Sequence, residues 1–174
     1  MTGLTFAQEN PLEQLEFYMG TWSIPEDEPF IVKNPKYKDL KVIDFEWGSE
    51  KRVIHSRTGI YAKNDTIMFS EGIITYNPTT NKLMWLEFQI DGNMLFEGEY
   101  RILDGNTVQR EYTVHYPVGD KTIPHPEVAG WTRLYRETFI RTSDNSIDWI
   151  TKTFINGKWI PGSSGGDAKA VRDK

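Results

Sequence analysis

An arginine that alternates with apolar and aromatic residues is the feature of the sequence with the clearest chemical meaning. Every second residue between positions 107 and 116 belongs to one such set: Val108, Arg110, Tyr112, Val114 and Tyr116. This alternation is typical of a strand with one face turned toward a core, so Arg110 should point inward. An unpaired buried charge is strongly unfavourable. Arg110 must therefore meet a carboxylate, a ligand anion or water.

Three residues are candidates for acid and base chemistry. Tyr112 shares the inward face of Arg110. Glu71 lies on the face of Ile67, Phe69 and Ile73, which makes it a matching carboxylate, although the opposite face is nearly as apolar. His55 shares a face with Val53 and Tyr61, and again the other face competes. The sequence leaves the inward face of residues 51–76 open.

The run from position 83 to 90 offers two faces of different character. Met84, Leu86, Phe88 and Ile90 form the more apolar set, which the alternation predicts to be the core face. Trp85 and Glu87 lie on the other face and are candidates to line a pocket. The full set of predicted ligand-binding residues is Arg110, Trp85, Glu87, Phe69, Tyr100 and Trp149.

Several other chemistries lack the residues that they need. The chain has no cysteine, which excludes disulfides, thiolate metal sites and a cysteine nucleophile. His55, His115 and His125 are too far apart for a metal-ligand motif. We find no nucleophile elbow, no phosphate-binding glycine loop and no dinucleotide fingerprint. We therefore expect neither a metal nor a cofactor.

Short strands joined by tight turns must position these residues. Asp-Gly pairs at 91–92 and 104–105 are strong hairpin signals. A meander of this length protects its edges most simply by closing into a barrel. Strands are predicted from residue 21 onward, at 40–47, 51–62, 66–76, 83–90, 94–103, 107–116, 131–142, 147–155 and 158–160.

The ends and the long loops complete the predicted organisation. Leu12, Leu15 and Met19 recur at helical spacing before a stop at Gly20. Residues 162–174 have nothing to bury and should form a disordered tail after a single domain of residues 1–161. Of two long loops, 24–38 and 117–130, the first either forms a lid over the barrel mouth or packs outside. The lid would consist of Phe30, Ile31, Val32 and Tyr37.

A helix followed by Gly20-Thr21-Trp22 and a run of antiparallel strands resembles the calycin superfamily of lipocalin-like barrels. The nearest likeness is to small bacterial lipocalin-like domains of the DUF1579 type, over residues 12–160. The resemblance implies an all-β, up-and-down antiparallel β-barrel with a short N-terminal helix. It also implies an inward Trp85, with Glu87 beside it, and a late-strand arginine, Arg136 or Arg141, packed on Trp22.

Two alternative likenesses rank lower. Nitrobindin-like barrels hold haem through a histidine near the C-terminus, and this chain has no histidine after His125. The α+β cone of polyketide cyclases needs two or three helices before its sheet, whereas only residues 10–19 look helical here.

The composition narrows the function classes. A net charge of −5 is unfavourable for nucleic-acid binding, no apolar run is long enough to span a membrane, and the first ten residues do not resemble a secretory signal. We expect a cytoplasmic protein, compatible with a homodimer, that binds a small hydrophobic or aromatic molecule. The alternatives are a cofactor-independent cyclase or isomerase that uses the same pocket, and a protein-interaction module.

Overall fold

The computed structural model describes residues 10–33, 40–62, 65–90, 94–116, 132–161 and 167–172. A 3-10 helix, η1 (Pro11–Tyr18), precedes the first strand, and two short helices, α1 (Pro29–Lys33) and η3 (Ser49–Lys51), lie on either side of the second. The strands are β1 (Gly20–Ser23), β2 (Leu40–Trp47), β3 (Val53–Ala62), β4 (Asp65–Asn77), β5 (Lys82–Gln89), β6 (Leu95–Ile102), β7 (Thr107–His115), β8 (Thr132–Ser143), β9 (Ser146–Ile155), β10 (Lys158–Pro161) and β11 (Ala168–Arg172).

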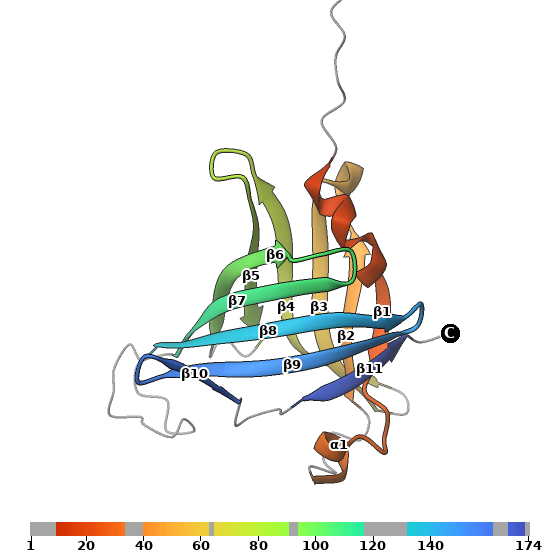
Figure 1. The fold of residues 1–174 in the computed structure, drawn as a ribbon. Helices are drawn as coiled ribbons and strands as arrows, with labels where there is room; N and C mark the ends of the chain where they lie inside the picture. Colours follow the sequence, from red (N-terminus) through yellow and green to blue (C-terminus); the bar gives the residue numbers. More distant parts are fainter. Residues whose placement is uncertain are drawn as a thin grey trace, which may run out of the picture.

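Ten of these strands close into a ring (Figure 1). The order runs from β1 through β8 in sequence, then to β9, to β11 and back to β1, and every neighbouring pair is antiparallel. One edge of β9 pairs with β8. Its other edge pairs with β11 along the first half of the strand and with β10 along the second half. The predicted fold class, an up-and-down antiparallel barrel, is confirmed.

The closing strand β11 corrects the predicted domain limits. Ala168–Arg172 lies in the segment predicted to be a disordered tail, yet it pairs with both β9 and β1. Ala170 is only 1% exposed. The segment buries one small side chain on its inner face, so its alternation is too weak to detect in the sequence. Backbone pairing with the edges of β9 and β1, rather than burial of its own apolar residues, holds this segment in the barrel.

The arginine that packs on the Trp22 ring is also a different residue from the one predicted. Arg172 lies over this ring at 4.7 Å and donates a hydrogen bond to the Phe17 carbonyl. Arg141 instead stacks on Phe17, and Arg136 stacks on Trp159. Because β11 was not recognised from the sequence, the arginine nearest to Trp22 could not be identified.

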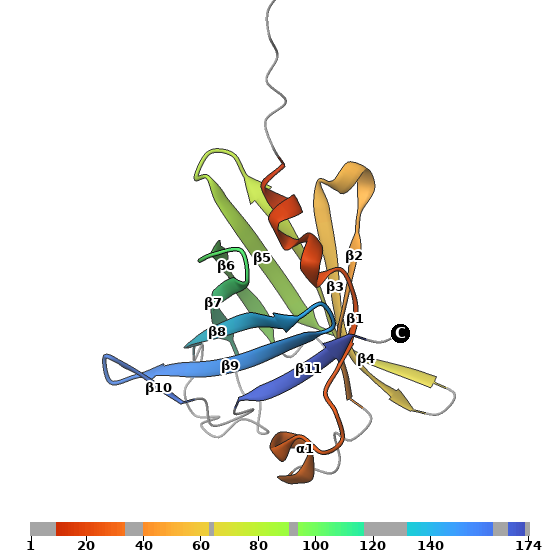
Figure 2. The same ribbon diagram turned by 45° about the vertical axis from the view of Figure 1, so that its right-hand side comes forward.

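The predicted N-terminal helix, η1, covers one end of the ring (Figure 2). Leu12, Leu15 and Tyr18 are buried, and the Trp22 indole donates to the Tyr18 carbonyl at 2.9 Å. Gly20 has a φ of 102°, which a residue with a side chain adopts only under strain, so it allows the chain to leave the helix and enter β1. An apolar hollow beneath η1 has a volume of about 20 Å³. This is room for about one water molecule, so this end of the barrel is packed.

The opposite end carries α1 (Figure 1). Part of the predicted lid lies in this short helix, where Ile31 is buried in the core and Val32 is 65% exposed. The Phe30 side chain and Tyr37 lie outside the described residues, as do residues 117–131, which include the second predicted loop (117–130) and His125. The structure therefore leaves the lid prediction a prediction.

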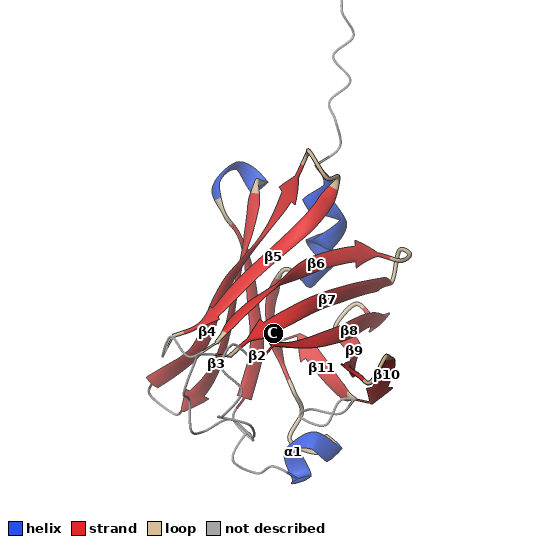
Figure 3. Ribbon diagram, turned by 90° about the vertical axis from the view of Figure 1, so that its left-hand side faces the viewer, coloured by secondary structure: helices blue, strands red, loops and turns tan. Residues whose placement is uncertain are grey.

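The inward face that alternation alone predicts for β5 is wrong, and the inward Trp85 that the family resemblance implies is confirmed. β5 is a strand of the barrel wall between β4 and β6 (Figure 3). Leu83, Trp85 and Glu87 are buried, whereas Leu86, Phe88 and Ile90 are 40–52% exposed on the other face. The barrel interior is partly polar here, so the more apolar face is not the buried one. Outside, apolar residues of adjacent strands lie opposite one another, as Leu86 does to Ile73 of β4. Such cross-strand pairs stabilise a sheet on either face.

Candidate ligand site inside the barrel

The strand register aligns the inward side chains in three rows. The first joins Ser56, Gly72, Glu87 and Phe96 across β3 to β6. The second joins Trp85, Gly98, Tyr112, Tyr135 and Thr153 across β5 to β9. The third joins Tyr100, Arg110, Glu137 and Thr151 across β6 to β9. Seven polar residues of the barrel interior form what we call the polar layer: Ser56, Ser70, Glu87, Tyr100, Arg110, Tyr112 and Glu137.

Arg110 is the central cation of the polar layer and is 5% exposed. Its Nε donates to Glu137 Oε2 at 2.9 Å, and its Nη2 donates to the same oxygen. Its Nη1 donates to the Tyr100 hydroxyl at 3.2 Å. Glu137 completes its own contacts by accepting from the Tyr112 hydroxyl at 2.9 Å. The inward orientation predicted for Arg110 is confirmed, and the carboxylate that it meets is Glu137.

Aromatic rings surround the guanidinium group. Its carbon lies 3.9 Å from the ring centroid of Trp85, which is a close cation-π contact. Tyr112 packs edge-on against Trp85, with ring centroids 5.0 Å apart, and stacks on Tyr135 at 5.5 Å. Trp85 is 3% exposed, and its Nε1 has no hydrogen-bond partner among the described residues. The site therefore combines an aromatic wall with a buried ion pair.

Glu87 is the second buried carboxyl group of the polar layer. Its Oε1 accepts from the Ser70 hydroxyl at 2.6 Å, and its Oε2 accepts from the Ser56 hydroxyl at 3.3 Å. Burial raises the pKa of Glu87, an effect that Arg110 and the two serines oppose only in part. Burial likewise raises the pKa of Tyr100 to about 12. The buried environment of Glu87 thus favours a bound proton on its carboxyl group.

Two glycines make these contacts possible. Gly72 lies between Ser56 and Glu87 in the first row, and a Cβ there would come within 2.8 Å of both side chains and 2.7 Å of the Leu86 carbonyl. Gly98 lies between Trp85 and Tyr112 in the second row, and a Cβ there would come within 2.5 Å of Tyr112 Cβ. At each of these positions the side chains of the two flanking strands meet across the middle strand, because its glycine has no side chain.

Replacing Gly72 by alanine is therefore expected to destabilise the protein by about 1–3 kcal/mol, the usual cost of overpacking. Urea unfolding followed by circular dichroism measures this loss. Gly105→Ala is the matched control, since a Cβ at Gly105 meets nothing within 4 Å. Equal stabilities of the two variants would show that the wall at Gly72 yields to the added methyl group.

Three predicted site residues lie outside the barrel wall. Glu71 is exposed and lies 3.9 Å from Arg57, an outer ion pair. Phe69 is 36% exposed. His55 lies on the same outward face of β3 as Arg57 and is not buried. The sequence leaves the inward face of residues 51–76 open, and in the structure the faces of Ser56 and Ser70 are the ones that turn toward Glu87. Glu71 and His55 are thus not placed to act inside the barrel.

The remaining predicted residues point inward. Arg110, Tyr112, Tyr100, Trp85 and Glu87 come together around the polar layer. Trp149 lines the apolar hollow under η1, which Tyr100 of the polar layer lines as well.

Sequence reasoning missed Ser56, Ser70 and Glu137. The alternation of Tyr135, Glu137 and Phe139 was the available signal for Glu137. Its pairing with Arg110 depends on the register across the long connection between β7 and β8.

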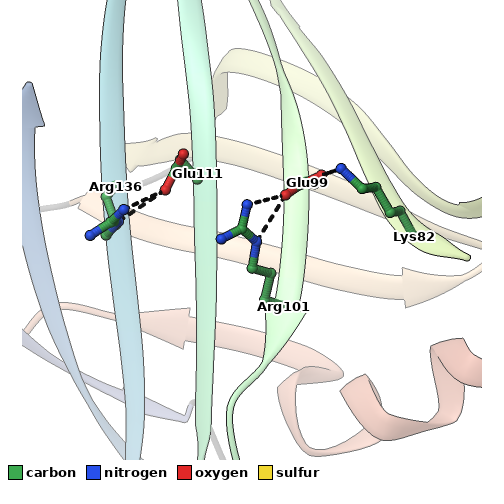
Figure 4. A network of polar contacts seen from close by, with 5 residues as sticks. All are labelled: Lys82, Glu99, Arg101, Glu111 and Arg136. Carbon is green, nitrogen blue, oxygen red and sulfur yellow. Dashed lines mark hydrogen bonds and ion pairs between the residues drawn. The ribbon is translucent and has the colours of Figure 1, made fainter. Parts of the chain in front are cut away.

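Charges on the outer wall form a separate network (Figure 4). Glu99 binds both Lys82, at 2.5 Å, and Arg101, whose Nε donates at 2.8 Å. Glu111 accepts from Arg136 at 2.7 Å. These pairs are partly or largely exposed and add little to stability. They contrast with the ion pair inside, whose two side chains are 6–7% exposed.

The class of protein that the fold and the interior define is a closed ten-stranded antiparallel β-barrel, consistent with the calycin-like resemblance. A scan against protein-family models finds no match, and a comparison with curated proteins finds no significantly similar sequence. The closer likeness to DUF1579-type domains stays a prediction. Within the described ranges, no helix is long and apolar enough to cross a membrane, and no group of His, Asp and Glu could hold a metal ion.

Proposed function

We propose that this barrel binds one small, largely apolar or aromatic molecule beside the polar layer. The observation that carries the proposal is the buried indole of Trp85, which has no hydrogen-bond partner among the described residues and lies against Arg110. Burying a polar group without a partner is unfavourable. A bound molecule that accepts a hydrogen bond from this indole would remove that cost.

Two further features support this location. Thr153 belongs to the row of Trp85 and is 1% exposed, and its hydroxyl also lacks a partner among the described residues. The packed end under η1 leaves room for only about one water molecule. A binding site is therefore expected in the half of the barrel away from η1, where the polar layer supplies orientation and the aromatic wall supplies contact area.

Native mass spectrometry of the purified protein tests the proposal. We expect a non-covalent mass adduct that disappears on denaturation, and a lower occupancy in Trp85→Phe, which keeps an aromatic ring but removes the indole N–H. Phe69→Leu, on the outer wall, is the control. If no adduct is found, and no compound in a thermal-shift screen of small aromatic molecules raises the melting temperature, the proposal fails.

A cofactor-independent cyclase or isomerase is the second candidate, and the burial of Glu87 favours it. A buried carboxyl group with a raised pKa beside a bound molecule can donate or accept a proton. In this version Glu87 takes the acid-base role, and Arg110 and Tyr112 orient the substrate. Loss of turnover in Glu87→Gln with retained ligand binding would distinguish the enzyme from a carrier.

The pH dependence of stability provides a separate test of Glu87. Because its pKa is raised in the folded protein, the folded state binds a proton more tightly than the unfolded state. The resulting stability is complete below the unfolded pKa of about 4.3 and is lost as pH rises through the folded pKa. In Glu87→Gln this loss should be absent, so the difference in unfolding free energy between the two proteins should change across that window. A difference that is constant with pH would contradict the raised pKa.

A further inference from the structure

Several hydrogen-bond donors of the polar layer are left over among the described residues once its internal bonds are counted. Both Glu137 oxygens accept bonds, from Arg110 and Tyr112. Arg110 has five N–H groups, and three of its donations are accounted for by Glu137 and Tyr100. The indole of Trp85 adds another donor without a partner among the described residues. A ligand at this site can therefore accept hydrogen bonds from Arg110 and Trp85.

The net charge of the polar layer depends on whether Glu87 carries a proton. Arg110 and Glu137 form a closed pair and cancel. The charged and titratable groups that act on Glu87 are Arg110 of β7, Glu137 of β8 and Tyr100 of β6. An ionised Glu87 would leave the layer with one net negative charge, suited to an ammonium group. A protonated Glu87 leaves it neutral and adds one more donor.

Burial favours the protonated form of Glu87, whereas the hydrogen bonds that it accepts from two serines favour the ionised form and offset burial only in part. Its two described polar contacts are neutral hydroxyls, Ser70 at 2.6 Å and Ser56 at 3.3 Å, and no cation is paired with it directly among the described residues. Arg110, the nearest cation, is committed to Glu137. Burial is the largest effect, so the pKa of Glu87 is raised.

From this arrangement we propose that the site recognises a neutral molecule with a hydrogen-bond acceptor, such as an aromatic ketone, and that Glu87 and the Trp85 indole donate to its oxygen. This proposal rests on the proposed function and specifies the ligand class. The acceptor oxygen would lie between Glu87 and Trp85, which are neighbours on the inner face of β5, and the ring system would lie along Phe96, Tyr112 and Tyr135.

Two probes of the same size and shape test the assignment. The first is 2-acetylnaphthalene, a neutral ketone, and the second is 2-(aminomethyl)naphthalene, a cation near neutral pH. Isothermal titration calorimetry should show that the ketone binds at least about tenfold more tightly, a difference of about 1.4 kcal/mol. Glu87→Gln, whose amide still donates, should retain ketone binding. Glu87→Leu should weaken ketone binding about tenfold, and urea unfolding verifies that both variants are folded.

The pH dependence completes the test. Ketone binding to the unmodified protein should weaken as pH rises and Glu87 loses its proton, while Glu87→Gln should bind the ketone equally across that range. Tighter binding of the amine, or ketone binding that is unchanged in Glu87→Leu, would overturn the assignment. Failure of both probes would overturn it as well. In that case a native adduct or another thermal-shift ligand would show that the barrel still binds a small molecule of a different class.

Discussion

A chain that ends at Pro161 is expected to lose most of its stability, even though the removed segment is rich in glycine and serine. This truncation deletes β11, which pairs with β9 on one side and β1 on the other. It removes the buried Ala170 and the Arg172 side chain that covers Trp22. Two strand edges are then left unpaired, and the ring opens. Domains of this kind are stable by only about 5–15 kcal/mol, so the loss of a ring strand should consume most of that margin.

Urea unfolding and near-ultraviolet circular dichroism measure the effect of the truncation. We expect a broad or absent unfolding transition and a weakened aromatic signal. A chain shortened only by Asp173 and Lys174 is the control and should unfold like the full-length protein. If the chain that ends at Pro161 unfolds with an unchanged midpoint, β11 does not contribute to the closed ring in solution.

The second large effect is expected from Arg110→Leu, which should destabilise the protein by about 3–5 kcal/mol. The substitution leaves Glu137 buried without its cation, and an uncompensated buried charge accounts for most of that cost. It also removes the cation from the face of Trp85. Arg101→Leu, the same substitution on the exposed outer network of Figure 4, should cost no more than about 1 kcal/mol.

The double variant Arg110→Leu, Glu137→Leu separates the ion pair from its surroundings. Replacing both charges by apolar side chains removes the unpaired carboxylate, so the double variant should be more stable than Arg110→Leu alone. Some loss should remain, because the Tyr112 hydroxyl no longer has Glu137 as its acceptor. Urea unfolding of the four proteins of this cycle gives the coupling energy. A coupling energy near zero would mean that the pair is not formed in solution.

The sequence predicts most strands to within two residues because turn signals and alternation are local. The β7 set is an example: its inward face is apolar apart from Arg110, so period-two alternation identifies it directly. The same reasoning fails for β5, where the outward face is the more apolar one. Alternation reports which face is more apolar, and it reports the buried face only where the interior itself is apolar.

The candidate site could be predicted only in part for a related reason. Arg110 and Tyr112 are visible within one strand, but Glu137 becomes their partner through the register of β7 with β8. Residues 117–131 separate these strands, and no turn chemistry fixes the register across so long a connection. The serine contacts of Glu87 could not be predicted for the same reason. Ser56 and Gly72 fall in one row with Glu87 only through the register of β3, β4 and β5.

The closing strand also has a consequence for how the protein is made. A ribosome releases β1 long before β11, which pairs with it about 150 residues later in the chain, as Trp22 does with Arg172. Throughout that interval the edge of β1 is open to strands of other nascent chains, and the edge of β9 is open from the time that β9 emerges until β11 follows it. The barrel can therefore complete its ring only after residue 172 has emerged, and slow synthesis or high expression should favour intermolecular pairing at these two edges.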